Sequence, residues 1–80
     1  MKGIDERRWR EAVYLAQENT KKSLRDLSEE AGFNSFYLYT SLSKDTAPKA
    51  EMIRFIAIKA KVRTDWIFGL TNIKERERIG

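Results

Sequence analysis

Cysteine and histidine are both absent from this chain of 80 residues. Without thiols or imidazoles it forms no disulfide, binds no metal through Cys or His, and lacks the commonest general base of enzymes. The carboxylates are scattered over predicted helices, and the sequence contains no glycine-rich phosphate loop. We therefore expect no catalytic residue, no metal site, no cofactor and no enzymatic activity.

Long apolar runs are missing as well. The longest near the middle of the second half is Phe55–Ile58, whereas a membrane-spanning helix needs about 20 apolar residues. The first eleven residues lack the apolar segment of a secretory signal. These features lead us to expect a cytoplasmic protein with no membrane partner.

The charge is modest but unevenly distributed. Sixteen basic and 12 acidic residues give a formal charge of +4, which suits a polyanionic partner and is equally common in ordinary soluble domains. No acidic residue occurs from Ala31 through Lys44. A surface that approaches phosphate groups avoids carboxylates, so this segment is the more informative feature.

The stretch Ser23–Ser43 predicts two short helices joined by a tight turn. The first helix, about residues 24–31, carries an apolar face at helical spacing, formed by Leu24, Leu27 and Ala31. Ser23 precedes it as an N-cap candidate. Gly32 follows where a helix end favours a residue that tolerates positive φ.

The second helix, about residues 35–43, is less clear from its own residues. Asn34 or Ser35 is a candidate N-cap, and Leu38 and Leu42 lie one turn apart on a shared face. Its Phe, Tyr, Thr and Ser residues have poor helix propensity, and the segment SFYLYTS alone is compatible with a β-strand. The helical interpretation depends on the preceding helix and turn and on the absence of a partner strand elsewhere.

Three more helices complete the expected fold. They are predicted at about residues 5–19, at 48 or 49 to about 61, and at 65–68 with Thr64 as N-cap. The first of these helices has an apolar stripe made of Trp9, Ala12, Val13 and Ala16. The stripe of the second is made of Met52, Ile53, Ile56, Ala57 and Ala60. The sequence thus predicts an all-α fold, a compact bundle of about five short helices with a central helix-turn-helix.

These residues carry a resemblance to a known family. The pattern Ser23, Leu27, Ala31, Gly32, Phe33 and Leu38 resembles the helix-turn-helix of lambda-repressor-like proteins of the phage repressor and Cro type. Residues 62–69 are similar to the closing helix of that family, so the resemblance covers most of residues 5–70. It implies a DNA-binding domain over residues 1–71, followed by a C-terminal tail or helix extension over 72–80.

The chain departs from the family pattern at three positions. Leu24 stands where a phosphate-contacting Gln is frequent, and Ser28 where a small apolar Ala is usual. Ser41 stands where the family has a branched apolar residue. The last departure leaves two registers open for the second helix, because Leu42 is an alternative packing residue.

The resemblance implies a sequence-specific regulator of transcription, a phage or prophage repressor that binds a double-stranded DNA operator as a homodimer. Carried over residue by residue, the base-reading positions are Ser35, Phe36 and Thr40, with Tyr39 beside them. The phosphate-contacting positions are Lys21, Lys22, Ser23, Asn34, Tyr37, Lys44, Thr46 and Lys49. The dimer candidates are Phe68, Leu70 and Ile73, for which packing within the subunit is the alternative.

The chemistry of the second helix limits direct base reading. It has no Arg, Lys, Gln or Asn for a bidentate contact, so we expect specificity to depend partly on DNA shape and on a thymine methyl near Phe36. Glu29 and Glu30 are expected to point away from DNA. A second hypothesis is a protein-interaction module, an antitoxin-like adaptor in which Phe36, Tyr37 and Tyr39 bind a partner protein. Each surface lysine is also compatible with ordinary solvation.

Overall fold

The computed structural model describes residues 3–44 and 46–76. Within these residues the chain forms helices and no β-strand beyond one isolated bridge. The helices are α1 (Glu6–Thr20), α2 (Leu24–Glu30), α3 (Tyr37–Ser43), α4 (Ala50–Ala60) and α5 (Thr64–Ile67). The predicted all-α fold of five short helices is confirmed for this part of the chain.

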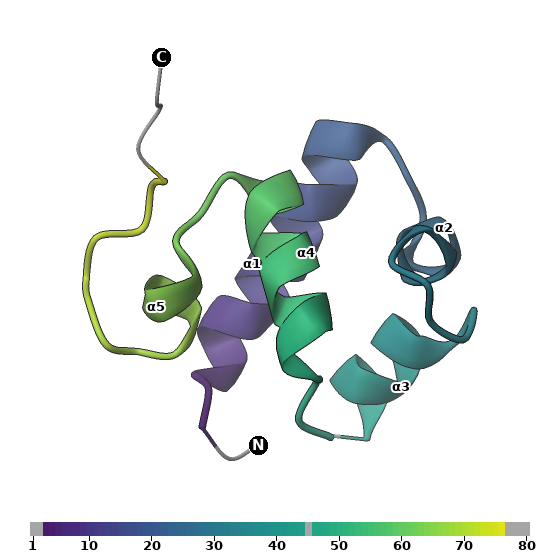
Figure 1. Cartoon of the computed structure of the whole chain (residues 1–80), viewed down its shortest axis with the longest axis horizontal. Helices are drawn as coiled ribbons and strands as arrows, with labels where there is room; N and C mark the ends of the chain where they lie inside the picture. Colours follow the sequence, from purple (N-terminus) through teal and green to yellow (C-terminus); the bar gives the residue numbers. More distant parts are fainter. Residues whose placement is uncertain (1–2, 45, 77–80) are drawn as a thin grey trace.

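The long helices α1 and α4 lie side by side through the centre of the molecule, with α5 on one flank and α2 and α3 on the other (Figure 1). Both predicted apolar stripes are confirmed, because every residue named in them is buried in the core. Leu27, Leu38, Val62, Trp66 and Ile67 complete the buried core. None of the helices in the described residues is long and apolar enough to span a membrane.

The helix ends agree with the sequence where a residue at the end itself makes the cap or the turn. Asp5 is the N-cap of α1, and its carboxylate accepts a hydrogen bond from the backbone N–H of Arg8 (3.1 Å). Ser23 is confirmed as the N-cap of α2, accepting from the N–H of Asp26 (3.1 Å). Gly32 adopts the predicted positive φ of 85°, which explains why a glycine stands in the turn between α2 and α3.

The start of α3 differs from the prediction. The helix begins at Tyr37, and its N-cap is Phe36, which makes no side-chain capping bond. The Asn34 side chain instead accepts from the N–H of Phe36 (2.8 Å) and closes a turn ahead of the helix. Neither Asn34 nor Ser35 is therefore the N-cap, and the β-strand alternative is wrong for residues 37–43.

Both serines that depart from the family pattern are buried and hydrogen-bonded. Ser28 Oγ donates to the carbonyl of Leu24 (2.8 Å) and accepts from the N–H of Leu38 (3.2 Å). Ser41 Oγ accepts from Trp9 Nε1 (3.3 Å) and donates to the carbonyl of Thr46 (2.9 Å). A buried hydroxyl is tolerated where its bonds are satisfied. Ser41 thus occupies the buried position of the helix.

The alternative register for α3, with Leu42 as the packing residue, is only partly supported. Leu42 is half-buried and packs against the edge of the core. The more deeply buried position belongs to Ser41.

The helices of the second half begin slightly later or earlier than predicted. Helix α4 begins at Ala50 after the N-cap Lys49, so the buried Pro48 lies ahead of the helix. Helix α5 has Arg63 as its N-cap and Thr64 as its first helical residue, so the prediction of Thr64 as N-cap is wrong by one position. These shifts leave the predicted order of elements unchanged.

Residues 71–76 form no helix and fold back onto the segment between α4 and α5. The N–H of Arg63 donates to the carbonyl of Lys74 (2.8 Å), and the N–H of Arg76 donates to that of Lys61 (3.2 Å). Arg8 of α1 donates to the carbonyls of Trp66 (2.9 Å) and Thr71 (2.8 Å). The predicted helix extension is wrong for residues 72–76, which form a tail bonded to the segment between α4 and α5; residues 77–80 lie outside the described residues.

Candidate functional site

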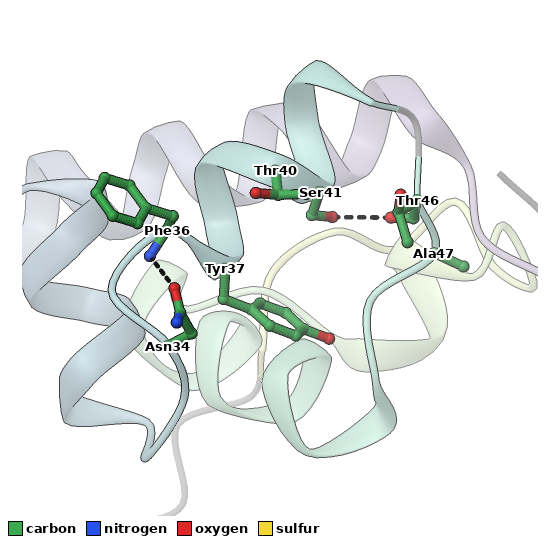
Figure 2. A pocket seen from close by; sticks show the side chains of 7 residues that line it. All are labelled: Asn34, Phe36, Tyr37, Thr40, Ser41, Thr46 and Ala47. Carbon is green, nitrogen blue, oxygen red and sulfur yellow. Dashed lines mark hydrogen bonds between the residues drawn. The ribbon is translucent and has the colours of Figure 1, made fainter.

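The four residues predicted to read bases lie at the start of α3, with Ser35 and Phe36 just ahead of the helix and Tyr39 and Thr40 within it. Phe36 is 67% exposed and Tyr39 62% exposed, while Ser35 and Thr40 are half-buried. Two large aromatic side chains thus stand exposed close together at the start of this short helix, which makes the surface a candidate binding site. Figure 2 shows the Phe36 side chain at the start of α3, directed to the opposite side from that of Tyr37.

Two hollows flank Phe36. One, of about 220 Å³, lies between α3 and the segment that follows it, and Figure 2 shows its lining residues Asn34, Phe36, Tyr37, Thr40, Ser41, Thr46 and Ala47. The other, of about 390 Å³, is lined by Ser23, Leu24, Arg25, Ser35, Phe36 and Tyr39. Both linings are largely apolar. Phe36 therefore forms a ridge between two shallow depressions.

The segment after α3 is fastened to that helix by side chains of α3. Ser41 holds the carbonyl of Thr46, as Figure 2 shows. The hydroxyl of Tyr37 accepts a hydrogen bond from the backbone N–H of Lys49 (2.6 Å), the residue that caps α4. The predicted phosphate ligands Lys44, Thr46 and Lys49 are exposed. Their backbone is therefore held at a fixed place beside α3.

Tyr37 itself is less free than the sequence suggested. Its ring lies 4.5 Å from that of Phe33 between centroids, and the side chain is half-buried. A phenolic oxygen that accepts one hydrogen bond keeps its own hydrogen for donation. Tyr37 therefore combines a packing role with one remaining donor at the surface.

The lysines before α2 are placed differently from one another. Lys21 ends α1 in the left-handed conformation (φ 57°) and is exposed. Lys22 forms an ion pair with Glu30, to which Lys59 also contributes a contact of 3.3 Å. The hydrogen bond from Lys22, followed by that from Lys59, lowers the pKa of the Glu30 carboxyl below its ordinary value of 4.5. Lys22 thus has a carboxylate partner already.

The two glutamates expected to point away from DNA are placed differently from one another. Glu30 turns towards Lys22 and Lys59, but the carboxylate of Glu29 accepts a hydrogen bond from the hydroxyl of Ser35. Glu29 also pairs with Arg25, with 3.5 Å between Nε and Oε2. The turn at Gly32 brings Glu29 back against the start of α3. An acidic group therefore lies beside a predicted base-reading residue.

Arg25 is a site residue that the sequence reasoning missed. Its side chain is 72% exposed and lines the same hollow as Ser35, Phe36 and Tyr39. The available signal was the spacing of Arg25 and Glu29, four residues apart on a predicted helix, which favours an ion pair. That signal gave no indication of the second contact to Ser35.

The dimer candidates separate into two kinds. Leu70 is 79% exposed and Ile73 is 61% exposed. Phe68 is half-buried and packs against the core of its own chain. Among the residues that the structure describes, Leu70 and Ile73 are therefore the large apolar side chains exposed beside α5.

No protein-family model matches the chain, and comparisons with curated proteins and with solved structures find no similar protein.

Proposed function

We propose that the protein is a sequence-specific regulator of transcription that binds double-stranded DNA through α2 and α3, in the manner of lambda-repressor-like proteins. The observation that supports it best is the surface at the start of α3, where Phe36 and Tyr39 are exposed, Thr40 is half-buried and the helix has no acidic residue of its own. A helix of this kind fits the major groove, which is about 12 Å wide.

The base contacts of the proposed complex come from α3 and the two residues before it. Phe36 meets a thymine methyl group, and the hydroxyls of Ser35, Tyr39 and Thr40 meet polar base edges. Because a hydroxyl can donate or accept, these contacts discriminate weakly between bases. Much of the sequence preference then comes from methyl contacts and DNA shape.

The phosphate contacts surround this helix. Lys44, Thr46 and Lys49 approach one strand, and Lys21, Lys22 and Ser23 approach the other side of the groove, with Asn34 and the remaining donor of Tyr37 between them. Such contacts fix the register of a protein on the duplex without reading its sequence. Lys22 shares its charge with Glu30, and Lys21 forms a looser and more exposed ion pair with Glu18 (4.0 Å), so the contribution of Lys22 is the smaller of the two.

The regulator acts as a dimer in the cytoplasm of its host and represses by occlusion. Leu70 and Ile73, which are exposed beside α5, meet their counterparts in the second subunit. Two α3 helices then enter successive turns of the major groove, about 34 Å apart, on a pseudo-palindromic operator of a phage or prophage.

Two substitutions test the proposal by gel-shift titration on duplexes selected from a random library. Thr40→Ala should relax the preference at one base step and leave binding to random DNA unchanged. Lys44→Ala should weaken binding to all duplexes and reduce the slope of log affinity against log salt by about one. Failure of the wild-type protein to prefer any duplex over random DNA would contradict the proposal.

A second candidate function is a protein-interaction module, and the largely apolar hollows on both sides of Phe36 favour it. Salt separates the candidates. Each neutralised phosphate adds roughly 0.9 to the salt slope of DNA binding, whereas an aromatic protein interface responds weakly to salt.

A further inference from the structure

Helix α3 lacks a side chain that can make a paired hydrogen bond with one base. From Ser35 to Ser43 the chain has no Arg, Lys, Asn or Gln. Such side chains make the contacts that discriminate most strongly in the major groove. A base-reading surface without one would have little direct means of recognising guanine.

Arg25 of α2 lies where this missing contact is needed. It shares a hollow with Ser35, Phe36 and Tyr39, and its side chain is largely exposed. Its closest approach to Glu29 is through Nε, and within residues 3–44 and 46–76 neither terminal nitrogen donates a hydrogen bond. A guanidinium restrained at Nε presents its two terminal amino groups as a planar fork.

Glu29 determines the position of that fork relative to α3. The same carboxylate oxygen, Oε2, pairs with Arg25 and accepts the hydrogen bond from the hydroxyl of Ser35. Glu29 therefore links Arg25 to Ser35, the first of the base-reading residues, and not to the lysines that approach phosphates. The carboxylate also repels phosphate oxygens, which disfavours a backbone contact at this point.

We propose that Arg25 reads a guanine, donating from its terminal nitrogens to O6 and N7 in the major groove, with Glu29 as the residue that positions it. The inference rests on the proposed DNA-binding function and adds guanine recognition to it.

The test uses duplexes selected by the wild-type protein from a random library, with each guanine replaced in turn by 7-deazaguanine, which lacks N7. At one position this replacement should lower wild-type affinity about tenfold, the scale of a bidentate base contact. Arg25→Lys keeps the charge but loses the fork, and it should lower affinity for the unmodified duplex by a similar factor. The 7-deazaguanine duplex should then cause Arg25→Lys no further loss.

Arg54→Lys is the matched control, since Arg54 is an exposed arginine on α4, and it should bind like the wild type. Thermal melting should be unchanged by either exchange because both side chains are at the surface. Selected duplexes without a required guanine would overturn the inference. So would an Arg25→Ala variant that weakens all duplexes equally and lowers the salt slope by about one, which identifies a phosphate contact. If the wild type selects no duplex, the proposed function itself fails, and this inference with it.

Discussion

Helices α3 and α4 are held in opposite ways. Helix α4 has eleven residues, buries five apolar side chains along one stripe, and carries a basic residue, Lys59, in its last turn, where the helix dipole favours it. Helix α3 has seven residues, of which only Leu38 and Ser41 are buried. The apolar stripe of α4 is a helical pattern in its own sequence that packs into the core. Helix α3 has little such pattern and depends on hydrogen bonds from other elements.

Both ends of α3 are capped by residues of other helices. At its start, where Phe36 offers no capping bond, Ser28 of α2 accepts from the N–H of Leu38. At its end, Arg10 of α1 donates to the carbonyl of Leu42 (2.6 Å). Helix termini leave such groups without partners inside the helix. A segment of poor helix propensity therefore becomes a helix because its neighbours satisfy its ends.

Among substitutions that remove contacts to α3, Ser41→Ala should lower the free energy of unfolding most. The change leaves the indole N–H of Trp9 and the carbonyl of Thr46 without their partner, which costs about 1–3 kcal/mol of unfolding free energy. Denaturant unfolding measures it. Ser43→Ala, at an exposed site in the same helix, is the control and should stay within about 0.5 kcal/mol of the wild type. Equal losses of unfolding free energy in the two variants would show that the hydrogen bonds of the buried Ser41 hydroxyl do not stabilise the fold.

A smaller effect, about 1 kcal/mol, is expected from Ser28→Ala, since an N-cap replacement by alanine has this scale. A cap supplied from α2 should be replaceable by one within α3. Adding Phe36→Asp to Ser28→Ala places a capping side chain at the N-cap position and should recover much of the loss in thermal melting. Phe36→Asp alone, in the wild-type background, should raise the melting temperature less than it does in the Ser28→Ala background. A larger gain in the wild-type background would disprove capping from α2.

The smallest effect concerns the contact between α2 and α4 through Glu30. Its pKa is lowered by Lys22 and Lys59 in the folded state, so the carboxylate stabilises the fold above its ordinary pKa of 4.5, and this stabilisation is lost as the pH falls through the lowered value. Glu30→Gln should therefore melt at a slightly lower temperature than the wild type at pH 7. The difference should disappear in strongly acidic solution; a difference that grows on acidification would contradict the ion pair.

Local patterns predicted what local physics determines. The stripes of α1 and α4, the cap at Ser23 and the positive φ of Gly32 all depend on residues within a few positions of one another. The start of α3 was misplaced because the hydroxyl that caps it, that of Ser28, accepts from the N–H of Leu38, a residue ten positions away. No periodicity in the chain encodes a bond of that kind.

The candidate site shows the same limit. Phe36 and Tyr39 were placed at the surface by the family resemblance, and their exposure agrees with that expectation, although the sequence alone left core or dimer packing open for both. The contact between Glu29 and Ser35 depends on how sharply the chain turns at Gly32, which composition does not report. The role proposed for Arg25 became visible only once that contact was known.

The tail that folds back beside α5 has a practical consequence for anyone who shortens or labels this protein. A chain cut after Leu70 would leave the guanidinium of Arg8 without the carbonyl of Thr71, and would remove Lys74 from the face of Trp66, to whose ring centre it lies 5.3 Å. A fusion or purification tag belongs beyond Arg76, where it leaves the contacts of Thr71 with Arg8 and of Lys74 with Trp66 intact.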